Sequence, residues 1–209
     1  FNYQPMKPKH NVLVLICALS LSALSCSALK DFSNTMTNLS RTKFKLDSIN
    51  GFQLAGIPLA GKTSVNIMDG AKLLAAFSKN ELPTTFTLNV GALNPNDGTG
   101  GTTKASSTLT SLAWTLIVDN TLTINGNIAN PITIPGTGQQ TNIPLQMSLD
   151  LMKFFKDKGY EHIVNLALAL GGANSAPSRL TLRVKPTVQT DFGPISYPNE
   201  IDVIDKEFR

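Results

Sequence analysis

The sequence holds few of the residues that make disulfides, metal sites or charged surfaces. Its 209 residues include 2 cysteines and 2 histidines, too few for a disulfide scaffold or a Cys/His zinc module. Charged residues make up 15% of the chain, against roughly 25% in an ordinary soluble domain. This composition excludes a charged disordered tail, a coiled coil and a multi-span membrane protein.

Residues 1–25 have the pattern of a secretory signal peptide. Residues 1–5 precede Met6 and are interpreted either as upstream residues or as the start of a fragment. Lys7 and Lys9 then form a basic segment, and an apolar run over 12–24 follows without a charge. That run is shorter than the about 20 residues that a membrane-spanning helix needs. We therefore expect residues 1–25 to be removed on export.

Cys26 is the predicted attachment point of a lipid. Small residues precede it in Ala23-Leu24-Ser25-Cys26, which resembles a bacterial lipobox, although Ala23 stands where leucine is usual. The same residues suit an ordinary signal peptidase, which would leave Cys26 as a free thiol. Lipidation is favoured because Cys26 is the only cysteine left once Cys17 is removed.

This leader predicts a bacterial envelope protein held at a membrane by N-terminal acyl chains. We expect the outer membrane, with the protein on its periplasmic or surface face. Residues 26–40 then comprise the lipidated cysteine and a small, polar tether.

From Phe44 onward, apolar and polar residues alternate with a period of two, which predicts strands with one buried face. The expected inward residues are Phe44 and Leu46; Phe86, Leu88, Val90 and Ala92; Leu112, Trp114, Leu116 and Val118; Leu122, Ile124, Gly126 and Ile128; Ile143, Leu145, Met147 and Leu149; and Leu180, Leu182 and Val184.

The two strands between Leu112 and Ile128 predict a hairpin with a three-residue loop over 119–121. That register sets Val118 opposite Leu122 and keeps both apolar faces inward, whereas a two-residue loop would turn one of them outward. It also sets Trp114 opposite Gly126, where a missing side chain leaves room for the indole.

Helical spacing appears in two further stretches. Asp69 can cap a helix with Leu73, Leu74 and Phe77 on one side. Residues 148–158 and 160–170 continue this spacing up to a Gly-Gly stop. Residues 160–170 also fit a strand by alternation, and their alanines and flanking glycines favour a helix. We expect these helices to lie over the open ends of the sheets.

A strand ending in Asn94-Pro95-Asn96, a hairpin over 112–126 and a strand rich in Thr and Pro over 132–145 follow one another. This order resembles the late embryogenesis abundant type 2 domain, also called the water-stress and hypersensitive-response domain, as carried by bacterial envelope lipoproteins. The resemblance covers 40–150 well and 150–190 loosely. The insertion over 98–108 and the apolar segment over 160–170 depart from it.

The resemblance implies a mainly β fold over residues 41–205: a fibronectin- or immunoglobulin-like β-sandwich with one to three helical additions. It also implies a role in stress or desiccation tolerance. Because the family has no established catalytic residues, none is carried over to this chain.

Turn chemistry accounts for each residue of Asn94-Pro95-Asn96. Pro95 lacks an N–H and stops the strand, and it holds Asn94 extended. Asn96 tolerates a left-handed backbone and can close an Asx turn with Asp97 and Gly98.

No motif predicts a reaction, so we expect no enzyme, cofactor or metal. The glycine-rich segment over 98–104 lacks the spacing of a phosphate-binding loop, and His162 has neither a Cys partner nor a carboxylate cluster near it in sequence. Without a dense basic cluster, nucleic acid is not expected as a partner. The open alternatives are a binding module for a lipid or other apolar ligand, in a groove near 150–170, and a protein partner at a sheet edge.

Overall fold

The computed structural model describes residues 41–99, 104–171, 180–190 and 193–203. The predicted signal peptide (1–25) and the lipidated Cys26 with its tether (26–40) lie outside the described residues. Residues 41–209 form a compact unit of their own. The fold is mainly β with antiparallel sheets, as the period-two pattern predicts.

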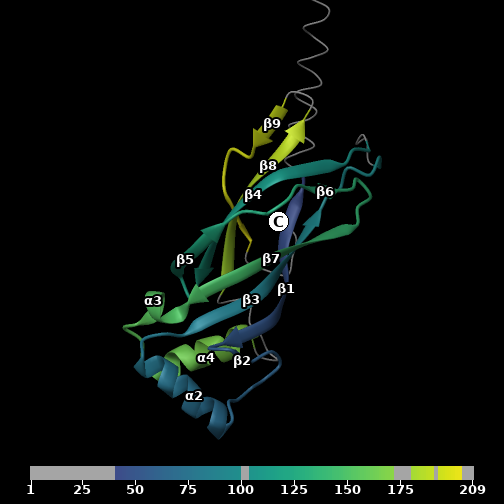
Figure 1. The fold of residues 1–209 in the computed structure, drawn as a ribbon. Helices are drawn as coiled ribbons and strands as arrows, with labels where there is room; N and C mark the ends of the chain where they lie inside the picture. The colour runs from purple at the N-terminus through teal and green to yellow at the C-terminus, as the bar shows by residue number, and fades with distance from the viewer. Residues whose placement is uncertain (1–40, 100–103, 172–179, 191–192, 204–209) are drawn as a thin grey trace, which may run out of the picture. The chain divides into compact units, whose positions relative to one another are not determined.

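Two antiparallel sheets make up the body of this unit (Figure 1). The first has the order β2-β1-β3-β7, with β1 over Lys43–Leu54, β2 over Ile57–Pro58, β3 over Pro83–Leu93 and β7 over Gln140–Asp150. The second has the order β10-β8-β4-β5, with β4 over Ser107–Val118, β5 over Thr121–Gly126, β8 over Leu180–Thr190 and β10 over Ile201–Val203. Two short strands extend it: β6 (Ile132–Ile134) pairs with β4, and β9 (Gly193–Ser196) pairs with β8.

The predicted inward faces are buried in β1, β3, β4, β7 and β8. Phe44, Val90, Leu116 and Ile143 are each 0% exposed. Apolar burial of this kind contributes about 25 cal/mol per Å² and is the main stabilising term of such a body. The core therefore consists of the apolar faces of both sheets.

The β4–β5 hairpin differs from the predicted register in one part. Its loop has two residues, because Val118 pairs with Thr121. Asp119 and Asn120 both have positive φ (47° and 61°), as a type I′ turn requires. As expected for a two-residue loop, one apolar residue is turned outward: Leu122 is 61% exposed.

A β-bulge then restores the predicted pairing further along the hairpin. The register shifts between Thr115 and Ile117, and one extra residue of β5 is accommodated there. Beyond the bulge, Trp114 pairs with Gly126, as predicted. The prediction was wrong for the loop and correct for this pair.

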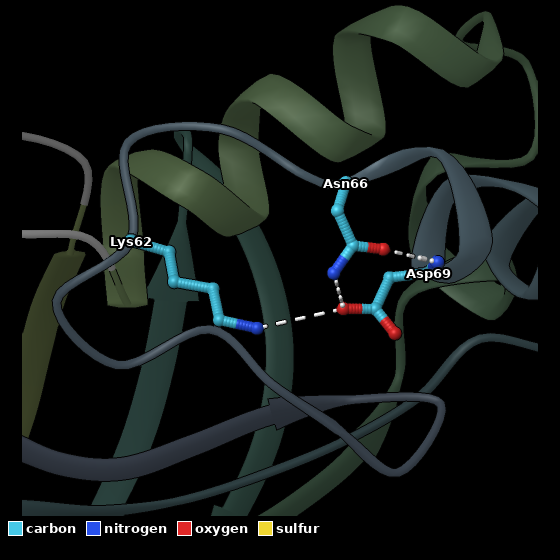
Figure 2. A network of polar contacts seen from close by, with 3 residues as sticks. All are labelled: Lys62, Asn66 and Asp69. Carbon is cyan, nitrogen blue, oxygen red and sulfur yellow. Dashed lines mark hydrogen bonds and ion pairs between the residues drawn. The ribbon is translucent and has the colours of Figure 1, made fainter.

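Helix α2 (Ile67–Ser78) begins at a different cap from the predicted one. The N-cap is Asn66, whose Oδ1 accepts the Asp69 N–H at 2.7 Å. The Asp69 carboxylate lies in the first turn and accepts hydrogen bonds from Asn66 Nδ2 and Lys62 Nζ (Figure 2). Of the residues expected on one inner side, Leu73 is 0% exposed but Leu74 is 52% exposed, so Leu74 faces outward.

Two more helices follow β7, at the same end of the unit as α2 (Figure 1). The predicted helix over 148–158 is shorter than expected, because β7 continues to Asp150 and α3 spans only Leu151–Phe155. Residues 160–170 are helical, in α4 (Tyr160–Gly171), so the helical interpretation is confirmed over the strand. Among the described residues, no helix is both long and apolar enough to cross a membrane.

Candidate binding groove

The connection between β5 and β6 leaves the sheet and forms one wall of a groove. Both strands pair with the same side of β4, and residues 127–131 lie between the two paired stretches. Where no strand pairs with β4, the side chain of Asn127 makes hydrogen bonds to it instead. Its Oδ1 accepts the Leu112 N–H at 2.8 Å, and its Nδ2 donates to Ser111 Oγ at 2.8 Å. The loop after Asn127 is thereby held away from β4 without leaving Leu112 unpaired.

The opposite wall is the edge of β7, the last strand in its sheet order. A groove of about 680 Å³ touches Pro144, Leu145 and Gln146 together with residues 127–130. Because consecutive side chains of a strand point to opposite faces, contact with all three β7 residues places the groove along the strand's edge.

The backbone of β7 explains how proline is accommodated on this edge. Leu151 N–H donates to Leu82 O at 3.1 Å, and the β3–β7 pairing continues from there without a shift. Backbone groups of antiparallel strands alternate in direction, so the even-numbered residues of β7 turn their N–H and C=O away from β3. Pro144 therefore stands where its missing N–H removes no bond within the sheet.

Trp114 from β4 reaches the same groove and carries a polar group without a partner. The side chain is 7% exposed, and among the described residues its indole N–H is buried with no hydrogen-bond acceptor. An unmet buried donor costs about 1–3 kcal/mol. Because this nitrogen has less than 1 Å² of accessible surface, an oxygen of a bound molecule would reach it only after a shift of the indole.

The rest of the lining is apolar or uncharged. Ile128, Ala129, Ile132, Pro144 and Leu145 provide apolar surface, and Thr87, Asn127, Asn130 and Gln146 provide neutral polar groups. Since a charged group would lose hydration here without gaining a counter-ion, this lining favours an uncharged ligand.

The predicted turn residues lie in a separate, buried network. Asn94 and Asn96 are both 0% exposed. The amide of Asn94 donates to Ala105 O at 2.8 Å and to Ile134 O at 3.2 Å, and its Oδ1 accepts the Asn96 N–H at 3.1 Å. The Asx turn thus starts at Asn94, not at Asn96.

A second Asx turn follows at Asp97, and it is here that the backbone becomes left-handed, at Gly98 (φ 94°). Asp97 Oδ1 accepts both the backbone N–H and the hydroxyl of Thr99, at 2.9 and 2.6 Å. These hydrogen bonds lower the pKa of the exposed Asp97 carboxyl. The pattern is that of loop closure at the start of the glycine-rich segment.

The structure brings His162 close to a carboxylate that the sequence did not suggest as its partner. His162 Nε2 on α4 lies 3.5 Å from Asp119 Oδ2 in the β4–β5 turn, and both side chains are partly exposed. When His162 is protonated, the pair attracts α4 to this turn. Within the described parts of the chain, no three His, Cys, Asp or Glu side chains are grouped as metal ligands.

The groove predicted near 150–170 stays a prediction, because residues 172–179 after α4 lie outside the described residues and the groove at the edge of β7 lies elsewhere. Apolar residues of α3 and α4, including Leu151, Phe155 and Leu166, are buried at 0–3% exposure. None of the groove residues was predicted from the sequence as a binding residue. Ile128 and Leu145 were predicted only to face inward, and so was Trp114. Its pairing with a glycine was the only signal in the sequence that this region packs unusually closely.

Comparisons with known proteins show no family for this chain. No family model matches the chain, and no curated protein matches it either. Among solved structures, a protein from Archaeoglobus fulgidus is similar at 12% sequence identity, over 78% of this chain and 99% of that one, with a TM-score of 0.33.

Proposed function

We propose that this chain is a non-catalytic, lipid-anchored protein of the bacterial cell envelope that acts by binding. The observation that supports binding is the uncharged groove, which Trp114 helps to line. The anchor rests on Cys26 and the leader before it. The outer membrane, with the protein on its periplasmic or surface face, is the proposed location.

The proposed ligand is uncharged and largely apolar, with one oxygen acceptor. Apolar surface of both the protein and the ligand would leave water on binding, since Ile128, Ile132, Pro144 and Leu145 line the groove. The acceptor would pair with Trp114 after a shift of the indole. A lipid tail joined to an ester or a carbonyl has this chemistry.

The family and the finer fold class belong to the same proposal. We infer a late embryogenesis abundant type 2 domain with an immunoglobulin- or fibronectin-like sandwich, on the order of the Asn94-Pro95-Asn96 turn, the hairpin and the strand after it. A role in stress or desiccation tolerance follows from that resemblance.

The single tryptophan of the chain allows a direct test of the groove. The chain beginning at Ser27, which keeps the whole unit over 41–209, is titrated with the uncharged apolar probe N-phenyl-1-naphthylamine. We expect saturable quenching of Trp114 emission. Ala129→Arg places a charge in the groove and should weaken binding at least about tenfold, because the guanidinium has no partner there.

The matched control is Ala71→Arg, at an exposed position of α2. It should leave probe binding unchanged. Quenching that does not saturate, or that Ala129→Arg leaves intact, would overturn the assignment of the groove.

The anchor is tested by the intact mass of the exported protein. We expect a chain that begins at Cys26 and carries the mass of acyl groups, and a Cys26→Ser variant that keeps its leader and gains no acyl mass. An unmodified chain beginning at Cys26 would show ordinary signal cleavage and remove the anchor from the proposal.

A further inference from the structure

Helix α2 turns an apolar stripe away from the body. Ile67, Met68 and Leu74 are 96%, 71% and 52% exposed, and Ala71 and Ala75 are exposed between them. Positions 67, 71, 74 and 75 share one face of a helix. Exposed apolar surface gathered on one face marks a contact site more often than scattered single residues do.

The stripe belongs to a helix that is fixed at both its start and its inner face. At the start, Asn66 caps the helix and Lys62 lies 3.5 Å from Asp69 (Figure 2). On the inner face, Gly70 O accepts the Tyr160 hydroxyl at 3.2 Å, and Phe77 packs edge to face on Tyr160 with ring centroids 5.5 Å apart. Ile67 and Met68 are therefore held outward by the packing of the helix.

The charged residues on the exposed side of α2 and at its C-cap are lysines, and the exposed Glu81 follows the C-cap two residues later. Lys72 and the C-cap Lys79 are exposed beside the stripe, one helical repeat of seven residues apart. The acidic residue of α2, Asp69, is partly buried and turned toward Lys62 and Asn66. The outward face therefore combines apolar side chains with cations, which is the pattern of a helix that lies in an anionic membrane interface.

We propose that α2 docks onto an anionic lipid surface, with Ile67, Met68 and Leu74 among the acyl chains and Lys72 and Lys79 at the headgroups. This contact is separate from the groove and from the anchor at Cys26. It would hold the helical end of the unit against a membrane.

The test uses the chain beginning at Ser27, which lacks the acylated residue, in a vesicle sedimentation assay. We expect binding to vesicles of phosphatidylcholine with phosphatidylglycerol. The double variant Ile67→Ser/Met68→Ser should lower the partition coefficient about tenfold or more, because two apolar side chains no longer leave water. The control is Leu122→Ser, which removes an apolar side chain that is 61% exposed on β5 and should leave binding unchanged.

The contribution of the lysines to vesicle binding is measured separately. Lys72→Gln/Lys79→Gln should weaken binding at low salt, and added salt should weaken wild-type binding toward the same level. Failure to bind these vesicles would overturn the proposal, as would an equal loss in Leu122→Ser. A dimer that Ile67→Ser/Met68→Ser dissociates, without vesicle binding, would assign the stripe to a second copy and also overturn it.

Discussion

The six-membered ring of Trp114 lies directly against Gly126. A Cβ built on Gly126 would stand 2.3 Å from Cζ2 of Trp114 and 2.8 Å from Cε2, far inside van der Waals contact. The indole thus occupies the space of the side chain that glycine lacks. Since Trp114 also lines the groove, this contact fixes part of the candidate site.

Gly126→Ala should destabilise the protein by about 1–3 kcal/mol, because the indole or the β5 backbone must shift to admit a methyl group. Urea unfolding followed by Trp114 emission measures the change. Gly70→Ala is the control: it lies in α2 with nothing within 4 Å, and it should leave stability unchanged or raise it by up to about 1 kcal/mol. Equal stabilities of the two variants would contradict the close contact.

This hairpin shows what the sequence could and could not predict. The alternation of apolar residues correctly paired Trp114 with Gly126, because the face of a strand is read directly from its period. The predicted loop was wrong, because the register shifts within the hairpin instead of running on unbroken. A bulge near Leu116 allows a two-residue turn while Trp114 still pairs with Gly126. As a result, Leu122 is exposed.

The turn itself predicts the effect of substitutions at Asn120, which has a φ of 61°. Asn120→Ala should destabilise by about 1 kcal/mol, because a Cβ disfavours the left-handed region and asparagine tolerates it better than alanine. Asn120→Gly should not destabilise, because glycine adopts this backbone freely. Thermal unfolding measures the stability of both variants. A similar loss of stability in both would show that the asparagine side chain stabilises the turn, and that the backbone conformation does not explain the effect.

Substitution of the buried Asn94 should reduce stability more than substitution of Asn120. Asn94→Ala removes the donor to two backbone carbonyls, of Ala105 and Ile134, and the acceptor of the Asn96 N–H. Because these groups stay buried, we expect a loss of about 2–4 kcal/mol in denaturant unfolding. Asn125→Ala, at an exposed position of β5, should cost less than about 0.5 kcal/mol. A loss at Asn94 as small as that would show that water replaces the network.

The groove could not be predicted from the sequence, for a different reason. Its walls come from Thr87 on β3, Trp114 on β4, residues 127–130 and the edge of β7, segments up to about sixty positions apart in the chain. The loop leaves the sheet because the Asn127 side chain substitutes for a strand. No periodicity in the sequence predicts that the chain leaves the sheet at this point. The burial of alternate residues, in contrast, follows from the local pattern alone.

Tyr197 predicts how stability depends on alkaline pH. Burial raises the pKa of its phenol to about 12, and the side chain of Thr42, which precedes β1, lowers this pKa by a smaller amount. In the unfolded chain the phenol ionises near pH 10, so above that pH only the unfolded state releases the proton. The stabilisation is therefore complete below about pH 10 and is lost as the pH rises toward 12.

Tyr197→Phe removes this titration and keeps the ring. Between pH 9 and pH 12, the wild-type free energy of unfolding should fall by about 2 kcal/mol more than that of the variant. Urea unfolding at a series of pH values gives both slopes, and the ionisation of lysines cancels in their difference. Parallel slopes would show that the phenol ionises alike in the folded and unfolded chain, and that the contact between Thr42 and the segment after β9 is open to water.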